Sequence, residues 1–339
     1  MIKKKIKIIA EAGCNHNGKL SLALQLINVA KKAGADAVKF QLFNPDELVT
    51  KNAPKANYAK KFTRKFKNQY EMQKKISLSF REHLKLKKYC DKKKIEYLCS
   101  AFDIESLNVL KKFKLKTFKI PSGEINNTKY LKHLGGFKKN ILLSTGMSSK
   151  KEIIFALKTL INSGVSKKKV IILQCNSEYP SPYKDINLQA MVSFKKEFNC
   201  DYGLSDHSLG IEVPIAAAAL GAKVIEKHFT LSRSDGGVDS AFSLEPDELR
   251  SLVVETKRAW QSIGSVTYGP SKAAEKNRVF RRSIYICKNI AKGELFDETN
   301  IRIIRPGDGA PPSLYSELIG KSARKNYSAG TPLSLEQLL

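Results

Sequence analysis

Short apolar runs alternate with helical patterns over the first 230 residues of this chain. Eight of these runs have the length and composition of β-strands: Ile6 to Gly13, Ala37 to Phe43, Ile95 to Phe102, Thr117 to Pro121, Ile141 to Thr145, Val170 to Asn176, Asp201 to Ser205 and Lys223 to Phe229. Because parallel strands need crossover helices, the alternation predicts a parallel sheet. Eight units in one domain predict a (β/α)₈ barrel, or TIM barrel. A doubly wound open sheet is the alternative, although no GxGxxG loop follows any strand.

The alternation of strand-like and helical segments ends after the eighth run. A last long helix, Asp247 to Ile263, is expected to complete a barrel domain of residues 1–263. Residues 264–276 begin with GSVTYGPS, whose Gly, Pro and Ser content predicts a linker. Residues 277–339 alternate short strand-like runs with turns, which predicts a small β-rich domain. A domain of about 60 residues is marginal for independent stability, so it is expected to dock on another surface.

Charge and cysteine content narrow the class of protein. The net charge is +28, but the basic residues are scattered in short triplets, which argues against nucleic-acid binding and favours attraction of an anionic substrate. The six cysteines are far apart and form no CxxC pair, so a reduced, cytoplasmic protein is expected. There is no apolar run of about 18 residues, so no membrane span is expected. The basic, then apolar, start is interpreted as a first strand rather than a signal peptide.

Two of the five histidines lie at the ends of the last two predicted strands. His207 and His228 each have an acidic neighbour, Asp206 and Glu226, and the segment Ile211 to Leu220 between them is typical of a tightly packed helix. Two imidazoles at neighbouring strand ends can hold one divalent cation and leave positions for substrate oxygens. Two packing histidines are the alternative.

Lysines inside predicted strands are unusual, because a buried ammonium group is costly without a partner, and Lys39 and Lys119 are two of them. Active sites of such barrels gather at the carboxyl ends of the strands. Lys39 and Lys119 are therefore predicted to form, with Ser122, Ser144 and Ser205, a cradle for a phosphate or carboxylate group. The alternative is that both lysines point outward and pair with acids of the helices.

Two carboxyl groups near strand ends are candidates for proton transfer, Glu11 and Glu124. The long polar connection from Asn44 to Ser79 follows the second strand and is expected to lie over the barrel mouth.

Lysines in a barrel also suggest an alternative enzyme class, an aldolase that forms a Schiff base with its substrate. A divalent cation makes that chemistry unnecessary, because it polarises a carbonyl directly.

The whole set of motifs resembles the sialic acid synthase family, whose members make nine-carbon keto sugars. The matching segments are IIAEAGCNHNG, ADAVKFQ, FKIPSGEI, ILLSTGM, CNSEYPSPYKDINLQAM, GLSDHSLGIE and VIEKHFTL. The C-terminal segments KNIAKGELFDETNIRIIRPGDG and LIGKSARKN resemble the small antifreeze-like (SAF) domain of that family. The resemblance covers nearly the whole chain.

The resemblance implies a transferase that condenses phosphoenolpyruvate with the open-chain aldehyde of a 2-acetamido sugar. A manganese or magnesium ion polarises the aldehyde, and phosphate leaves by C–O cleavage. By motif, the phosphoenolpyruvate site would comprise Lys39, Ser100, Lys119, Ser122, Ser144 and Ser205, the metal ligands would be His207 and His228, the acid–base groups Glu11 and Glu124, and the sugar contacts Gln41, Asn57, Tyr179, Asp239 and Arg305. In the family, the small domain reaches across a two-fold, domain-swapped dimer to the partner's site.

The acceptor sugar is less closely defined by the motifs. GGVDSAFSLEP, NRVFRRSIY and RPGDGAPP look like pseudaminic acid synthases, whereas EAGCNHNG and KIPSGEI look like neuraminate or legionaminate synthases. Gln174 stands where a histidine is common in the family, which affects the expected acceptor contacts. N-acetylmannosamine is the leading expectation, and a 2,4-diacetamido-2,4,6-trideoxyhexose is the alternative. A non-catalytic sugar-binding protein is the remaining hypothesis.

Overall fold

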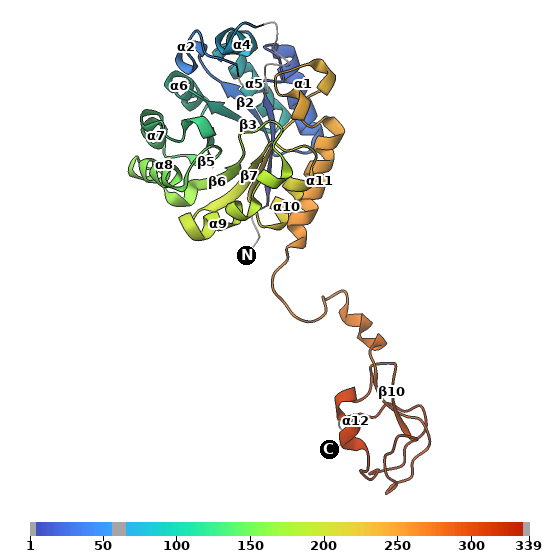
Figure 1. The fold of residues 1–339 in the computed structure, drawn as a ribbon. Helices are drawn as coiled ribbons and strands as arrows, with labels where there is room; N and C mark the ends of the chain where they lie inside the picture. The colour runs from blue at the N-terminus through green and yellow to red at the C-terminus, as the bar shows by residue number, and fades with distance from the viewer. Residues whose placement is uncertain (1–4, 56–65, 335–339) are drawn as a thin grey trace. The chain divides into compact units, whose positions relative to one another are not determined.

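The computed structural model describes residues 5–55 and 66–334 of the chain. The chain divides into two compact units, the first ending at Gly264 and the second beginning at Ser265 (Figure 1). Asn57, one of the predicted sugar contacts, lies outside the described residues. Within the described ranges, no helix is long and apolar enough to cross a membrane.

The first unit is a closed barrel of eight parallel strands in sequence order. The strands are β1 Lys7–Gly13, β2 Ala37–Leu42, β3 Glu96–Ala101, β4 Thr117–Ile120, β5 Asn140–Ser144, β6 Val170–Cys175, β7 Asp201–Asp206 and β8 Val224–His228. Each strand pairs with the next, and β8 pairs with β1 in a register that places Glu11 beside His228. The predicted (β/α)₈ barrel is confirmed.

Helices surround the barrel on its outer side (Figure 1). They are α1 Leu20–Ala33, α2 Pro45–Leu48, α4 Gln69–Ile76, α5 Phe80–Lys93, α6 Ile104–Lys112, α7 Thr128–Gly135, α8 Lys150–Asn162, α9 Leu188–Phe198, α10 Glu212–Ala219 and α11 Pro246–Ser262. Capping residues start several of them, and Ser79 and Ser149 each form a complete capping box. The connection between β2 and β3, which the sequence suggested only as a long loop, contains α2 and α4.

The barrel interior changes from apolar to polar along the strands. Its apolar layer is a buried cluster of Ile9, Ala37, Leu98, Leu142, Leu173 and Val224. Two residues further along the same six strands lie Glu11, Lys39, Ser100, Ser144, Cys175 and Glu226, which all line one pocket. Because side chains alternate between the two faces of a strand, a residue two positions further on points into the barrel again. One apolar layer therefore forms the floor of the polar pocket.

The second unit has its own small core. β9 Ser283–Ile286 and β10 Ile301–Ile304 pair antiparallel, and α12 Tyr315–Leu318 follows them. The buried residues of this unit are Ile284, Ile286, Ile290, Phe296, Ile301, Ala310, Leu318, Ala323, Tyr327 and Leu333. This β-rich unit agrees with the predicted SAF domain.

Two histidines outside the pocket, His16 and His83, are almost fully buried. His83 Nδ1 lies 2.7 Å from the Tyr97 hydroxyl, and His16 Nδ1 accepts a hydrogen bond from the Gly18 amide at 3.1 Å. Burial lowers the pKa of His16 from 6.5 to about 4 and that of His83 to about 3. Both imidazoles are therefore neutral in the folded protein at neutral pH.

Acidification should destabilise the fold through these histidines. Their folded-state pKa values are lowered, so the unfolded chain binds more protons below about pH 6.5 and stability falls as the pH decreases. Between about pH 7.5 and about pH 5, His83 should account for a loss of about 2 kcal/mol. Urea unfolding at the two pH values gives the free energy of unfolding of each protein. Over this pH range it should fall by about 2 kcal/mol less in the His83→Gln variant than in wild type. An identical loss in both proteins would contradict the assignment.

Candidate active site

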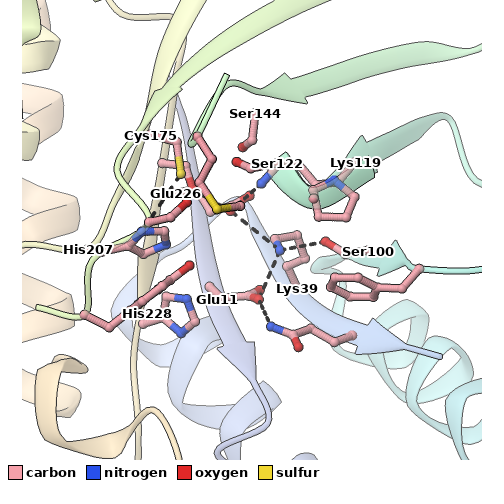
Figure 2. A pocket seen from close by; sticks show the side chains of 18 residues that line it. Glu11, Lys39, Ser100, Lys119, Ser122, Ser144, Cys175, His207, Glu226 and His228 are labelled. Carbon is pink, nitrogen blue, oxygen red and sulfur yellow. Dashed lines mark hydrogen bonds and ion pairs between the residues drawn. The ribbon is translucent and has the colours of Figure 1, made fainter. Parts of the chain in front are cut away.

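A pocket of about 320 Å³ lies at the carboxyl ends of the barrel strands (Figure 2). All eight strands contribute to it. The lining residues are Glu11, Lys39, Gln41, Ser100, Phe102, Lys119, Pro121, Ser122, Gly123, Ser144, Met147, Cys175, Ser177, Tyr179, Ser205, His207, Glu226 and His228. Most of the residues that the sequence predicts for substrate and metal binding therefore lie around one cavity.

Two buried lysines point into this pocket and share two carboxylates. Lys39 Nζ lies 3.0 Å from Glu11 Oε1 and 3.5 Å from Glu226 Oε1. Lys119 Nζ lies 2.7 Å from the same Glu226 oxygen. All four side chains are at most 5% exposed. The lysines pair inside the barrel rather than with acids of the helices, the alternative considered from the sequence.

Hydroxyl groups extend this network at both ends. Lys39 Nζ donates to Ser100 Oγ at 3.0 Å, and Ser205 Oγ donates to Glu226 Oε1 at 2.9 Å. Ser122 Oγ accepts a hydrogen bond from the Gly146 amide at 2.9 Å. These contacts fix the hydroxyl groups around the lysines before any ligand binds.

The charges of the network follow from its geometry. Burial raises the pKa of Glu226, but Lys119 and Lys39 outweigh it and bring the value to about 2. Burial also raises the pKa of Glu11, and there Lys39 does not fully compensate. Burial lowers the pKa of Lys39, whereas Glu11 and Glu226 raise it overall. An amine held in its protonated form is a poor nucleophile, which argues against a Schiff base at Lys39.

Several buried polar atoms of the pocket lack a hydrogen-bond partner among the described residues. They are Glu11 Oε2, Ser144 Oγ, Glu226 Oε2 and His228 Nδ1. Buried polar groups are normally satisfied, so a group of unsatisfied ones around one cavity indicates a ligand that supplies the missing partners. The Ser144 hydroxyl and the ammonium groups of Lys39 and Lys119 are donors that suit an anionic ligand.

The two predicted metal ligands face each other across the ends of β7 and β8. The ring centroids of His207 and His228 are 5.3 Å apart. His207 Nδ1 lies 2.5 Å from the Asn176 carbonyl oxygen, so it donates its proton there and Nε2 carries the lone pair. A histidine that binds a metal through one ring nitrogen usually donates the N–H of the other to a carbonyl or carboxylate oxygen. The pair therefore fits a divalent cation.

The electrostatics of the two imidazoles differ. Burial, reinforced by His207, lowers the pKa of His228 well below its ordinary value. Burial also lowers the pKa of His207, but Cys175, whose Sγ lies 3.9 Å from Nδ1, raises it overall. No group of three His, Cys, Asp or Glu side chains suited to a metal occurs in the described part of the chain. A cation here would thus have two protein ligands and positions left for substrate or water.

A buried ion pair lies on the opposite face of these two strands. Lys227 Nζ donates to Asp206 Oδ2 at 2.5 Å and also contacts the Ser208 carbonyl oxygen. Asp206 Oδ1 accepts from the Ser208 amide at 3.0 Å. Asp206 directly precedes His207 and Lys227 directly precedes His228. The pair therefore joins the strand ends from which both histidines project.

Three of the predicted sugar contacts lie in or beside the pocket. Gln41 and Tyr179 line it, and Gln41 Nε2 donates to Glu11 Oε1 at 3.2 Å. Asp239 lines a smaller chamber that shares Gln41, Tyr179 and His228 with the pocket. Burial, followed by the effect of Glu11, raises the pKa of Asp239 to about 7.

The predicted acid–base group Glu124 is not brought to the pocket. Glu124 does not line it, because its carboxylate accepts a hydrogen bond from Asn127 Nδ2 at 2.8 Å in the turn after β4. Arg305 is exposed, directly follows β10 and belongs to the second unit. Their functional roles stay predictions.

Two residues absent from the predicted set occupy central places. Glu226 contacts both lysines, and Cys175 lies beside His207. Alternation along β8 was the available signal for Glu226, since it lies two residues before His228 and shares its face. No comparable sequence signal exists for Cys175, which resembles the other buried thiols.

The comparisons with known proteins agree with this site. The NeuB family matches residues 26–268 and the SAF domain matches residues 281–339. N,N'-diacetyllegionaminic acid synthase of Campylobacter jejuni is 44% identical over 96% of this chain and 97% of that protein. Pseudaminic acid synthase of the same species (strain 81-176) is 39% identical over 97% of this chain and 96% of that protein.

A solved structure supports the same relationship. N-acetylneuraminic acid (sialic acid) synthetase from Leptospira borgpetersenii superimposes with a TM-score of 0.70. It is 35% identical and covers 80% of this chain and 90% of its own. The resemblance predicted from the motifs is confirmed. The chain is therefore an enzyme that belongs to the NeuB family and carries a C-terminal SAF domain.

Proposed function

We propose that this enzyme condenses phosphoenolpyruvate with a 2,4-diacetamido-2,4,6-trideoxyhexose and water, giving a nine-carbon 2-keto acid and phosphate. The observation that carries the proposal is that two buried lysines and two histidines face one cavity. The relatives named for legionaminic and pseudaminic acids support a diacetamido acceptor better than N-acetylmannosamine, the leading expectation from the sequence. Within this class, the 44% relative favours the acceptor that leads to N,N'-diacetyllegionaminic acid.

The lysine end of the pocket would bind phosphoenolpyruvate. Lys39 and Lys119 supply two ammonium groups, and Ser144 supplies a hydroxyl without another partner in the described chain. Ser100 and Ser205 hold these groups in place through their contacts with Lys39 and Glu226. The bound phosphate and carboxylate would take over part of the ion pairing that Glu226 provides in the empty pocket.

The histidine end would bind the aldehyde of the acceptor. His207 and His228 would hold a divalent cation, manganese or magnesium by resemblance, which polarises the aldehyde when bound. Gln41 and Tyr179 lie beside the pair and would orient the sugar. The two substrates would then meet between the lysines and the histidines.

The bond changes of the reaction balance with water as the third reactant. The methylene carbon of phosphoenolpyruvate bonds to the aldehyde carbon, whose oxygen becomes a hydroxyl group. Water adds to the carbon that bears the phosphate, the C–O bond to phosphate breaks, and the keto group forms. We assign proton exchange with that water to Glu11, whose raised pKa and central position suit the task.

Phosphate release from phosphoenolpyruvate tests the proposal. Wild-type enzyme with manganese should release phosphate with a diacetamido-trideoxyhexose, more slowly with N-acetylmannosamine, and not at all after EDTA treatment. His207→Ala and His228→Ala should each lower the rate about a hundredfold or more, with metal binding in calorimetry lowered in parallel. Release that resists EDTA, or none with any 2-acetamido sugar in folded, metal-loaded protein, would refute the proposal.

We further propose that the enzyme is a homodimer in the cytoplasm. The family resemblance supports a domain-swapped homodimer in which Arg305 reaches the partner's acceptor site. A solution mass of one chain in light scattering would contradict that assembly. The six free cysteines, five of them buried, support a cytoplasmic setting.

A further inference from the structure

A small chamber of about 80 Å³ adjoins the reaction pocket. It shares Gln41, Tyr179 and His228 with that pocket, and α4 supplies another part of its wall. Residues 69, 72, 73 and 76 of α4 lie on one face of the helix and all line the chamber. None of them lines the pocket that contains the two lysines.

The α4 wall presents two amide oxygens that have no hydrogen-bond donor in the part of the chain that the structure describes. Gln69 Oε1 and Gln73 Oε1 are buried, and neither has a partner within the described residues. The two side chains are one helical turn apart, so their amides can meet the same ligand group. Buried acceptors without donors are unfavourable, which indicates that a ligand supplies the missing N–H or O–H groups.

An apolar surface lies next to these two oxygens. Met72, Ile76 and Val238 line the same chamber and belong to one buried apolar cluster. The volume of about 80 Å³ corresponds to roughly two or three water molecules, so the chamber admits a group of a few heavy atoms. Two acceptor oxygens that can share one N–H, beside an apolar patch, match an acetamido group, which has one N–H donor and a methyl group.

We infer that this chamber binds the 4-acetamido group of the acceptor sugar, with Gln69 and Gln73 as its specificity determinants. The inference rests on the proposed function and names the feature that would select a diacetamido acceptor. The aldehyde and the adjacent C2 must lie at the histidine pair, in the reaction pocket. The glutamines line the adjoining chamber and not that pocket, so we assign to them a sugar substituent beyond C2.

The test compares two acceptors that differ only at C4, the diacetamido-trideoxyhexose and its 4-hydroxy counterpart. Gln69→Leu and Gln73→Leu should each lower kcat/KM for the diacetamido sugar about tenfold, because each removes an acceptor for the amide. The 4-hydroxy sugar should lose less than about threefold. Where it is not turned over, its inhibition constant replaces kcat/KM. Gln25→Leu, which removes an exposed amide on α1, should change neither value.

The outcomes separate the two levels of the proposal. Wild-type enzyme that does not use the diacetamido sugar refutes the proposed function, and the inference is refuted with it. Wild-type activity with equal losses for both sugars in the glutamine variants refutes the inference alone, since the chamber would then bind a group common to both. Thermal melting of each variant checks that the fold is intact.

Discussion

Replacing Lys119 with methionine is expected to lower kcat/KM for phosphoenolpyruvate by about a thousandfold. The Lys119 ammonium lies 2.7 Å from Glu226 and points into the pocket. Its removal takes away one of the two buried ammonium groups of the pocket and leaves Glu226, paired only with Lys39, facing the incoming phosphate. Steady-state phosphate release at saturating acceptor, with phosphoenolpyruvate varied, measures the effect.

Two matched variants identify the cause of this loss. Lys129→Met removes the same charge from an exposed position on α7, so it should keep wild-type kinetics. Lys119→Arg keeps the charge in a bulkier, planar group and should lie between methionine and wild type. A Lys119→Met enzyme within a few-fold of wild type would show that this lysine does not bind the anion.

The barrel was predictable because its signals are local. Strands of four to seven residues alternate with crossover helices, and this pattern predicts a parallel sheet without knowledge of distant contacts. The number of units, eight in one domain, favours a closed barrel over an open sheet. α2 and α4 were missed because the connection that contains them is polar and short of a helical apolar pattern. The chamber inferred for the acceptor is lined by α4, so the sequence alone did not indicate Gln69 and Gln73 as binding residues.

The site was predictable to the extent that strand ends define it. Parallel strands bring their carboxyl ends together, so Lys39, Lys119 and His207 were expected near one another. Side-chain direction after a strand is not set in this way. The Glu124 carboxylate accepts a hydrogen bond from Asn127, three residues later, instead of pointing into the pocket. The alternation of residues along a strand does not predict such a local contact.

The sequence predicted that the buried lysines would pair with carboxylates, but not which carboxylates these are. A buried lysine demands a carboxylate, yet Lys39 and Lys119 share Glu226, which lies more than 100 residues from either in the chain. Such pairings depend on barrel register, which sequence alone does not give.

Replacing Lys227 with methionine should destabilise the barrel and misplace its histidines. Lys227 and Asp206 form a buried pair, with side chains 1% and 0% exposed. Removal of one partner leaves a buried carboxylate without a counter-charge, which costs about 3–5 kcal/mol. Urea unfolding should show this loss. Lys223→Met, at the residue just before β8, should stay close to wild type, since Lys223 has no ion pair among the described residues.

A second substitution separates stability from the placement of the histidines. Asp206→Asn combined with Lys227→Met removes both charges, so the double variant should regain most of the lost stability. His207 and His228 would still lack the link that joins their strand ends, so metal binding and kcat should remain lowered about tenfold or more. If kcat and metal affinity recovered together with stability, the pair would be structural only. If Lys227→Met were as stable as wild type, the buried pair would contribute little to the fold.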